Sequence, residues 1–390
     1  MRQRASMLAC WLCSHDSFCH IGYHPAKMTA LTQSIRFCTA QDGVRIAYAV
    51  TGQGPPIVRA AHFLTHLDFD LGSPVWRPWL AELSRGHQLI RYDGRGCGLS
   101  DAAPSALSLE VWLADLEAVI DAAGLERFAL FGCSQGAATA IAYAAKHPER
   151  VSCLVLLGGY ARGLRHRSPS PEQVTEAKLL LDMIKVGWGK ENPAFRQLFT
   201  LLFIPEGTAE QVRWFNELER LSCDPEHAAR TLEAFGHIDV SDLAAKITCP
   251  TLVLHARGDA RVPFEEGRLM AGLTPGARFV PLDSRNHVLL ESEPAFTHGF
   301  GEIRAFLNEH QNVRQHAQAY PALTPGEREL VELLAHGLDN LQIAAHLGLS
   351  EKTVRNKVSA VFDKLEVATR AQAIVRAREA GFGARSLRGD

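Results

Sequence analysis

The sequence has no long apolar run, little net charge and no regular pattern of cysteines. It therefore offers little sign of a membrane protein, of a protein that binds a polyanion over its whole surface, or of a disulfide-stabilised protein. No apolar run reaches about 18 residues, so a membrane-spanning helix is not expected. The net charge is only −2, so any surface for nucleic acid must be local. The nine cysteines are an odd number scattered along the chain. They favour reduced thiols and a cytoplasmic location over a disulfide framework.

The composition that remains is typical of globular domains. Of the 390 residues, 46% are hydrophobic and 22% are charged, which excludes collagen, a coiled coil and wholesale disorder. This length predicts two or three domains with substantial cores. We expect no metal and no organic cofactor.

Residues 1–30 differ from the rest because they show no clear periodicity. They contain a small group of metal-binding residue types: Cys10, Cys13, Cys19, His20 and His24. Such residues can bind zinc, although the second pair lacks the spacing of a zinc finger. The alternatives are a disordered extension and translation that begins at Met28. We infer no function from this segment.

From about residue 31, short apolar runs alternate with helical stretches. The runs expected to be strands are residues 44–49, 57–61, 89–92, 128–131, 153–157 and 252–255. The clearest helix spans residues 109–123, and Gly124 should end it. This alternation predicts an α/β domain over residues 31–310, with a doubly wound, mostly parallel sheet.

One serine stands at the junction of a strand and a helix. The segment Gly132-Cys133-Ser134-Gln135-Gly136 is a G-x-S-x-G motif, which follows an apolar strand and precedes an alanine-rich helix. In this arrangement the serine hydroxyl is exposed on a strained turn at a helix N-terminus. The glycines are expected because side chains there would collide with the neighbouring strand and helix.

A serine nucleophile needs a base, and the base needs an orienting acid. Asp259 follows the strand expected at residues 252–255, and His287 follows the next apolar segment. Both therefore lie at strand ends, in the chain order serine, acid, histidine. Asp283, within the segment before the histidine, is a weaker candidate for the acid.

These motifs resemble those of the α/β-hydrolase family, and the resemblance extends over residues 35–308. It includes residues 92–101, with the sequence Tyr-Asp-Gly-Arg-Gly-Cys-Gly-Leu-Ser-Asp. The resemblance implies that Ser134 is the nucleophile, that His287 is the general base and that Asp259 orients it.

The same resemblance implies two backbone N–H groups that stabilise an oxyanion, those of Gln135 and Phe63. The family usually has a glycine before the second donor, and here His62 takes its place. A displaced donor can cost about 10²–10³ in rate, so the triad can be complete while turnover is poor. We expect His62 and His66 to be ordinary loop residues, with a place in the pocket wall as the alternative.

Residues 160–245 interrupt the strand pattern and contain helical stretches at 174–188 and 195–203. In α/β-hydrolases this region forms a helical lid. Six aromatic residues are candidates either for the roof of a pocket or for the core of the lid: Trp188, Phe195, Phe199, Phe203, Trp214 and Phe215.

A polar linker at residues 311–322 is expected to lead to a small all-α domain at residues 323–385. Four short helices there have clear signals at their starts, at Thr324, Asp339, Ser350 and Thr369, and at three of their ends, at Gly337, Gly348 and Gly381. Only residues 348–350 join the second and third helices, which predicts a helix-turn-helix.

The third of these helices separates an apolar stripe from a polar surface. The stripe consists of Val354, Val358, Val361 and Leu365. The candidates for contact with DNA are Lys352, Thr353, Arg355, Asn356, Lys357, Ser359 and Lys364. Such a helix fits the major groove, where Arg and Asn read the edges of guanine and adenine.

The small domain resembles the LuxR/FixJ-type helix-turn-helix. The matching stretches are residues 323–325, 327–329, 343–347, 349–355, 364–365 and 370–373. The resemblance implies that the third helix binds double-stranded DNA and that the fourth pairs two subunits, giving a homodimer. Lys357 stands where that family commonly has histidine.

Three functions remain open at this point. The first is a transcription regulator whose hydrolase domain senses, and can hydrolyse, a small ester, lactone or amide. The second is a serine hydrolase of the carboxylic-ester type whose DNA module is secondary. The third is a receptor without turnover. We favour the first, because a DNA-binding module has no need of so large a domain unless that domain supplies a signal. The effector and the operator stay open, as does the choice between activation and repression.

Overall fold

The computed structural model describes residues 31–102, 107–319, 323–380 and 382–383. The cysteine- and histidine-containing segment at residues 1–30 and the expected helix end at Gly381 lie outside these ranges.

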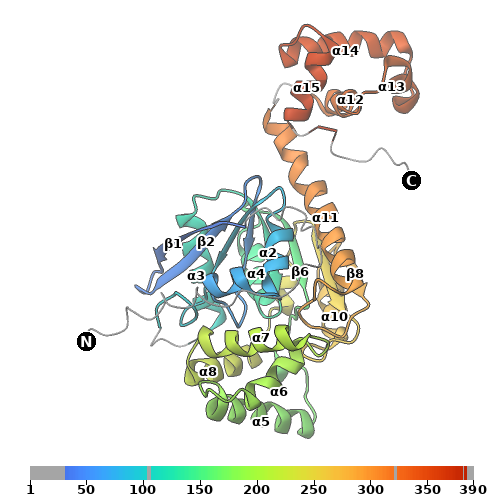
Figure 1. Cartoon of the computed structure of the whole chain (residues 1–390). Coiled ribbons are helices and arrows are strands. Elements are labelled where there is room, and N and C mark those ends of the chain that lie inside the picture. The colour runs from blue at the N-terminus through green and yellow to red at the C-terminus, as the bar shows by residue number, and fades with distance from the viewer. Residues whose placement is uncertain (1–30, 103–106, 320–322, 381, 384–390) are drawn as a thin grey trace, which may run out of the picture. The chain divides into compact units, whose positions relative to one another are not determined.

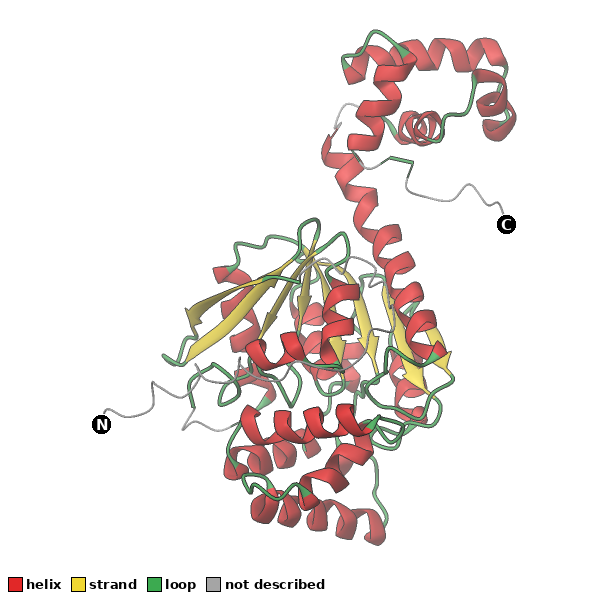
Figure 2. Ribbon diagram, in the orientation of Figure 1, coloured by secondary structure: helices red, strands yellow, loops and turns green. Residues whose placement is uncertain are grey.

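One sheet of eight strands forms the centre of the larger domain (Figures 1 and 2). The strands are β1 (Gln33–Thr39), β2 (Arg45–Thr51), β3 (Pro56–Arg59), β4 (Gln88–Tyr92), β5 (Phe128–Cys133), β6 (Val151–Leu157), β7 (Thr251–Ala256) and β8 (Arg278–Leu282). Their order is β1-β2-β4-β3-β5-β6-β7-β8. Strand β2 runs antiparallel to both β1 and β4, and all other pairs are parallel. The predicted doubly wound, mostly parallel sheet is thus confirmed.

Helices pack on both faces of this sheet. They are α1 (Leu67–Gly72), α2 (Trp76–Leu83), α3 (Leu109–Ala122), α4 (Gly136–Lys146), α9 (Ser241–Ala244), α10 (Phe264–Leu273) and α11 (Pro294–Ala319). Helices α3, α4 and α10 contact the strands on one face. On the other face, Trp79 of α2 packs edge-on against Phe131 of β5 and Phe300 of α11. Buried apolar side chains on both faces explain why the strands read as continuous apolar runs.

The expected strands occur within one to two residues of their expected ends, and α3 ends at Ala122 with Gly124 at φ +67°. Two findings differ from expectation. Edge strand β1 was not anticipated, because its side chains alternate between exposed and half-buried and form no apolar run. Helix α11 continues to Ala319, through residues expected to be a linker. That stretch is polar, so it has no apolar residues at helical spacing from which a helix could be predicted.

A helical lid lies between β6 and β7 in the chain. It consists of η1 (Leu164–His166), α5 (Pro171–Gly187), α6 (Ala194–Phe203), α7 (Ala209–Ser222) and α8 (Pro225–Gly236). Helix α5 packs against α6 and α8, and α6 packs against α7. Ser170 and Thr208 form capping boxes that start α5 and α7. The two expected lid helices are present, and α7 and α8 add to them.

The smaller domain contains α12 (Pro325–Ala335), α13 (Asn340–Leu347), α14 (Glu351–Leu365) and α15 (Arg370–Glu379). Capping boxes start α12, α13 and α15, and Ser350 caps α14. Gly348 ends α13 in the left-handed conformation at φ +64°, and Ser350, the N-cap of α14, follows two residues later. The expected apolar stripe of α14 is buried in the domain's core.

Candidate active site

The candidate nucleophile lies on the tight turn between β5 and α4. Ser134 has a φ of +52°, a left-handed conformation that is strained for a residue with a side chain. The glycines of the motif allow this turn to pack closely. A Cβ at Gly132 would lie 2.7 Å from Cα of Ala137, and one at Gly136 would lie 3.0 Å from the carbonyl oxygen of Ala60. The expected reason for both glycines is thereby confirmed.

The structure brings the three predicted triad residues together. His287 Nε2 lies 2.9 Å from Ser134 Oγ, and His287 Nδ1 lies 2.7 Å from Asp259 Oδ2. The serine follows β5, the aspartate follows β7 and the histidine follows β8, so all three lie at the carboxyl edge of the sheet. Ser134, His287 and Asp259 thus stand in hydrogen-bond contact, which is the arrangement that serine nucleophilic catalysis requires.

The second carboxylate oxygen of Asp259 is fixed by the backbone. Asp259 Oδ1 accepts from the N–H groups of Arg261 and Val262, each at 2.8 Å. Burial disfavours the charged form of this carboxyl, but the charge and hydrogen bond of His287 outweigh it, so the pKa of Asp259 is lowered. Asp259 is therefore ionised and held in one orientation toward His287.

A second histidine supports the same carboxylate from behind. His255 is fully buried, and its Nε2 lies 3.0 Å from the carbonyl oxygen of Val262 and 3.5 Å from Asp259 Oδ2. A carbonyl oxygen only accepts, so Nε2 carries the ring proton. The other candidate acid, Asp283, is exposed and makes no contact with His287.

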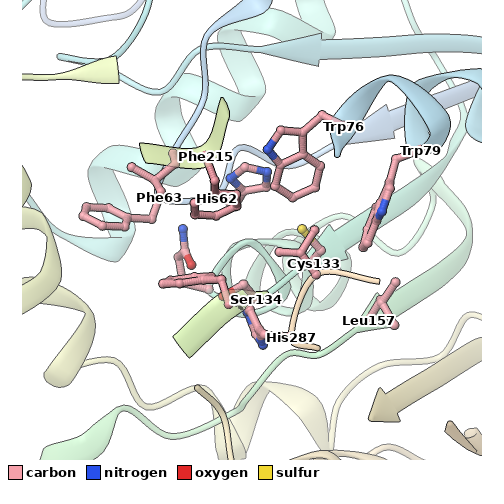
Figure 3. A pocket seen from close by; sticks show the side chains of 13 residues that line it. His62, Phe63, Trp76, Trp79, Cys133, Ser134, Leu157, Phe215 and His287 are labelled. Carbon is pink, nitrogen blue, oxygen red and sulfur yellow. Dashed lines mark hydrogen bonds between the residues drawn. The ribbon is translucent and has the colours of Figure 1, made fainter. Parts of the chain in front are cut away.

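A cavity of about 350 Å³ opens beside Ser134 (Figure 3). Its wall is formed by His62, Phe63, Leu64, Trp76, Trp79, Cys133, Ser134, Gln135, Leu157, Phe203, Phe215, His287 and Val288. Both expected oxyanion residues, Gln135 and Phe63, are therefore at the cavity.

The two loop histidines, His62 and His66, have different positions in the structure. His62 is buried in the cavity wall, stacked on Trp76 with ring centroids 4.6 Å apart. This is the alternative to the ordinary loop position that we expected. His66 accepts a hydrogen bond from the backbone N–H of Phe69 and so caps α1.

The six lid aromatics also divide. Phe203 and Phe215 line the cavity, whereas Trp188 and Phe199 are buried against each other within the lid. Phe195 is partly exposed, and Trp214 packs on Phe69 of α1. Both interpretations of the aromatic set therefore hold, each for different residues.

Sequence reasoning missed several residues around the cavity. Trp76 and Trp79 reach it from α2, and Leu157 reaches it from the end of β6. Arg59 lies directly behind the wall. Its signal was available, because a charged residue stands at the end of an otherwise apolar buried strand.

One lid carboxyl is buried without full hydrogen bonding. Glu219 of α7 is fully buried, and its Oε1 accepts from the hydroxyl of Thr200 at 2.7 Å, while Oε2 has no partner among the described residues. Burial raises the pKa of Glu219 well above its usual range, against the lowering effects of Thr200 and Arg196. The folded lid thus favours the protonated carboxyl.

We expect the change Glu219→Gln to stabilise the protein at alkaline pH relative to acidic pH. The raised pKa stabilises the fold below the unfolded-state pKa of about 4.3, and this stabilisation is lost as pH rises through the folded-state value. Glutamine keeps the shape and does not titrate. Thermal melts at pH 5 and pH 8 measure the difference. Glu217→Gln, which alters a half-exposed ion pair with Arg220 on the same helix, is the control, and an equal response of both variants would contradict the assignment.

The candidate DNA-binding residues of α14 present a separate exposed face. Lys352, Thr353, Arg355, Asn356, Lys357, Ser359 and Lys364 all belong to exposed positions of the helix. Arg355 pairs with Glu351 one turn earlier at 2.9 Å. Lys364 instead donates to Glu327 of α12 at 2.7 Å, and this hydrogen bond lowers the pKa of Glu327 to about 2. Lys364 is therefore tied to the domain's own fold, and the other six residues form the open face.

Comparison with known proteins agrees with both domains. A family model described as alpha/beta hydrolase fold matches residues 66–202. A model described as bacterial regulatory proteins, luxR family, matches residues 321–377. The larger domain is therefore an α/β-hydrolase domain. The chain joins it to a LuxR-type helix-turn-helix domain.

Individual relatives resemble the hydrolase part. A putative carbamate hydrolase RutD of Klebsiella pneumoniae is 29% identical over 55% of this chain and 80% of its own length. A pyrrolizixenacetamide deacetylase of Xenorhabdus hominickii is 27% identical over 65% of this chain and 91% of its own length. The solved esterase of Exiguobacterium antarcticum has a TM-score of 0.60 at 24% identity, covering 70% of this chain and 98% of its own.

None of the helices in the described ranges is long and apolar enough to cross a membrane. In the same ranges, no three His, Cys, Asp or Glu side chains gather as a possible metal site.

Proposed function

We propose that this chain is a cytoplasmic, DNA-binding transcription regulator whose hydrolase domain binds a small ester, lactone or amide and cleaves it at Ser134. The observation that carries the proposal is the connected Ser134–His287–Asp259 set, at 2.9 and 2.7 Å, in a chain that also has a LuxR-type domain. The relatives named as a carbamate hydrolase and a deacetylase support a carbonyl substrate with a leaving oxygen or nitrogen.

The geometry supports acyl transfer in two steps. His287 Nε2 accepts the proton of Ser134 Oγ as that oxygen attacks the carbonyl carbon, and Asp259 stabilises the resulting imidazolium. The N–H groups of Gln135 and Phe63, both at the cavity, would stabilise the oxyanion. His287 then gives its proton to the leaving group. In the second step His287 takes a proton from water, the water oxygen attacks the acyl carbon, and His287 returns the proton to Ser134 Oγ as the acid product leaves.

The DNA half of the proposal rests on the open face of α14. Its short polar and basic residues project from a helix whose opposite side is buried in the domain core. An α-helix of this kind enters the major groove and contacts base edges with its N-terminal part. Two subunits would then read two half-sites, which is the basis for proposing a homodimer.

We expect Arg355→Ala to lower affinity for the selected DNA site by roughly ten- to a hundredfold, because a base-reading arginine is worth about 1–3 kcal/mol. Non-specific binding should change far less. The measurement is fluorescence anisotropy of the full chain with a site obtained by selection from random DNA, at several salt concentrations.

The matched control for Arg355 is Arg268→Ala, which removes another exposed arginine that pairs with a glutamate on its own helix, here in the hydrolase domain. It should leave DNA affinity unchanged. A full chain that selects no sequence, or an equal loss in both variants, would contradict the regulator assignment.

One observation favours the receptor as a second candidate function. His62 occupies the position where the family has glycine, directly before the Phe63 donor. A displaced donor would leave binding intact and slow turnover. In that case ligand binding, rather than cleavage, would be the signal.

A further inference from the structure

A buried arginine lies behind one end of the substrate cavity. Arg59, at the end of β3, is only 3% exposed. Its guanidinium donates to His62 Nε2, lies 4.0 Å from Cys133 Sγ and stacks on Trp76 at 4.6 Å from the ring centroid. All three residues that it contacts line the cavity. The positive charge is therefore separated from the ligand space by a single layer of side chains.

No carboxylate in the described part of the chain forms an ion pair with this guanidinium. The acid whose charge acts on it, Asp70, pairs with Arg91 at 3.2 Å instead. Burial raises the pKa of Asp70 to about 6, and the charges of Arg91 and Arg59 act against this rise. A buried charge without a paired anion is costly, and an anion that enters the adjoining cavity offsets that cost.

The contact with Arg59 also fixes the proton on His62. A guanidinium only donates hydrogen bonds, so His62 Nε2 must be the accepting nitrogen and the ring proton sits on Nδ1. Burial, and next to it the charge of Arg59, hold the pKa of His62 well below its usual range, so the ring is neutral. The ring's donor is therefore Nδ1–H, which is polarised by the cation on the other side of the ring. Figure 3 shows His62 beside Trp76, across the cavity from His287.

We propose that the cavity takes short acyl groups that end in a carboxylate, and that His62, positioned by Arg59, binds this carboxylate. The class of ligand is a half-ester or half-amide of a small dicarboxylic acid. The inference rests on the proposed function, because it names the acyl group cleaved at the same site. The cavity wall away from His62 is mostly apolar and aromatic, which suits the hydrocarbon part of such an acyl group.

The experiment compares two ligands that differ mainly in one terminal group, monomethyl succinate and methyl butyrate. Calorimetry is done on the full chain carrying Ser134→Ala, so that neither ester is cleaved. We expect monomethyl succinate to bind about ten- to a hundredfold more tightly, the range for a hydrogen bond to a charged group.

Two further substitutions in this background test the residues. Arg59→Met should abolish the preference, whereas Arg59→Lys should keep part of it. His62→Phe preserves an aromatic ring on Trp76 but removes both nitrogens, and it should abolish the preference too. Since Arg59 is buried, circular dichroism checks folding, and His62→Phe decides the matter if Arg59→Met does not fold.

Equal affinity for the two esters, no binding of either, or a preference that survives His62→Phe would overturn the proposal. Its failure is distinguishable from failure of the proposed function, which depends on covalent reaction at Ser134 in the unmodified chain. A chain that reacts at Ser134 without preferring the anion loses only this inference. A chain that prefers the anion without reacting keeps it as a receptor for the same ligands.

Discussion

A serine-reactive phosphonate should attach once per chain, to Ser134, and Ser134→Ala should carry no adduct. Removal of the nucleophile should also lower hydrolysis of any accepted ester by about 10⁴–10⁶-fold, as expected when one member of a cooperating set is removed. The physical reason is that Ser134 Oγ is the oxygen aligned with His287 Nε2, at 2.9 Å. Intact-protein mass spectrometry followed by peptide mapping measures the adduct.

Ser152→Ala is a suitable control for this experiment. Ser152 is a half-buried serine of β6 whose hydroxyl lies 4.0 Å from the sulfur of Cys153, and its loss should leave labelling unchanged. Absence of an adduct on folded, unmodified protein would rule out hydrolysis as proposed and leave the receptor as the function. An adduct that persists in Ser134→Ala would place the nucleophile elsewhere.

Asp259→Asn should slow both labelling and ester hydrolysis by about 10⁴-fold while leaving the fold intact. The structure explains the size of the effect. Asp259 Oδ1 accepts from two backbone N–H groups, so the oxygen of the asparagine will stay there and its NH₂ group will face His287 Nδ1. That nitrogen must then accept, which moves the ring proton to Nε2 and blocks transfer from Ser134.

The matched variant is Asp283→Asn, at the other acid that the sequence offered. Asp283 is exposed, so its substitution should leave both rates within about twofold, since surface changes away from a site have small effects. Labelling rates measured with excess phosphonate, together with thermal melts of each variant, separate chemistry from stability. Equal rates for Asp259→Asn and the unmodified chain would remove Asp259 from the mechanism.

The sequence was sufficient to predict that Ser134, Asp259 and His287 lie together, because local sequence features mark each of these residues. Ser134 lies in a G-x-S-x-G motif between an apolar strand and a helix, and Asp259 and His287 follow strands in the expected order. Parallel strands then bring their carboxyl ends to one edge of the sheet without further information. The helix starts of the small domain were predictable for the same reason, since capping residues act within a single turn.

The surroundings of His62 could not be predicted in this way. They combine Arg59 from β3, Trp76 from α2 and Cys133 from β5, and no local pattern specifies that meeting. The roles of the lid aromatics could not be predicted either. The spacing of aromatic residues along a helix is the same whether their rings face the cavity or pack inside the lid. Only the packing of α6 against α7 places Phe203 and Phe215 at the cavity.

The left-handed backbone of Ser134, at φ +52°, connects activity to evolutionary history. This conformation costs about 1–2 kcal/mol for a residue with a side chain, and glycine avoids most of that cost. A lineage that came to use the cavity only for sensing would gain stability by exchanging this serine for glycine, because nothing would then oppose the change. Among regulators of the same architecture, we therefore expect serine at this position in those that still hydrolyse a ligand and glycine in some of those that only bind one.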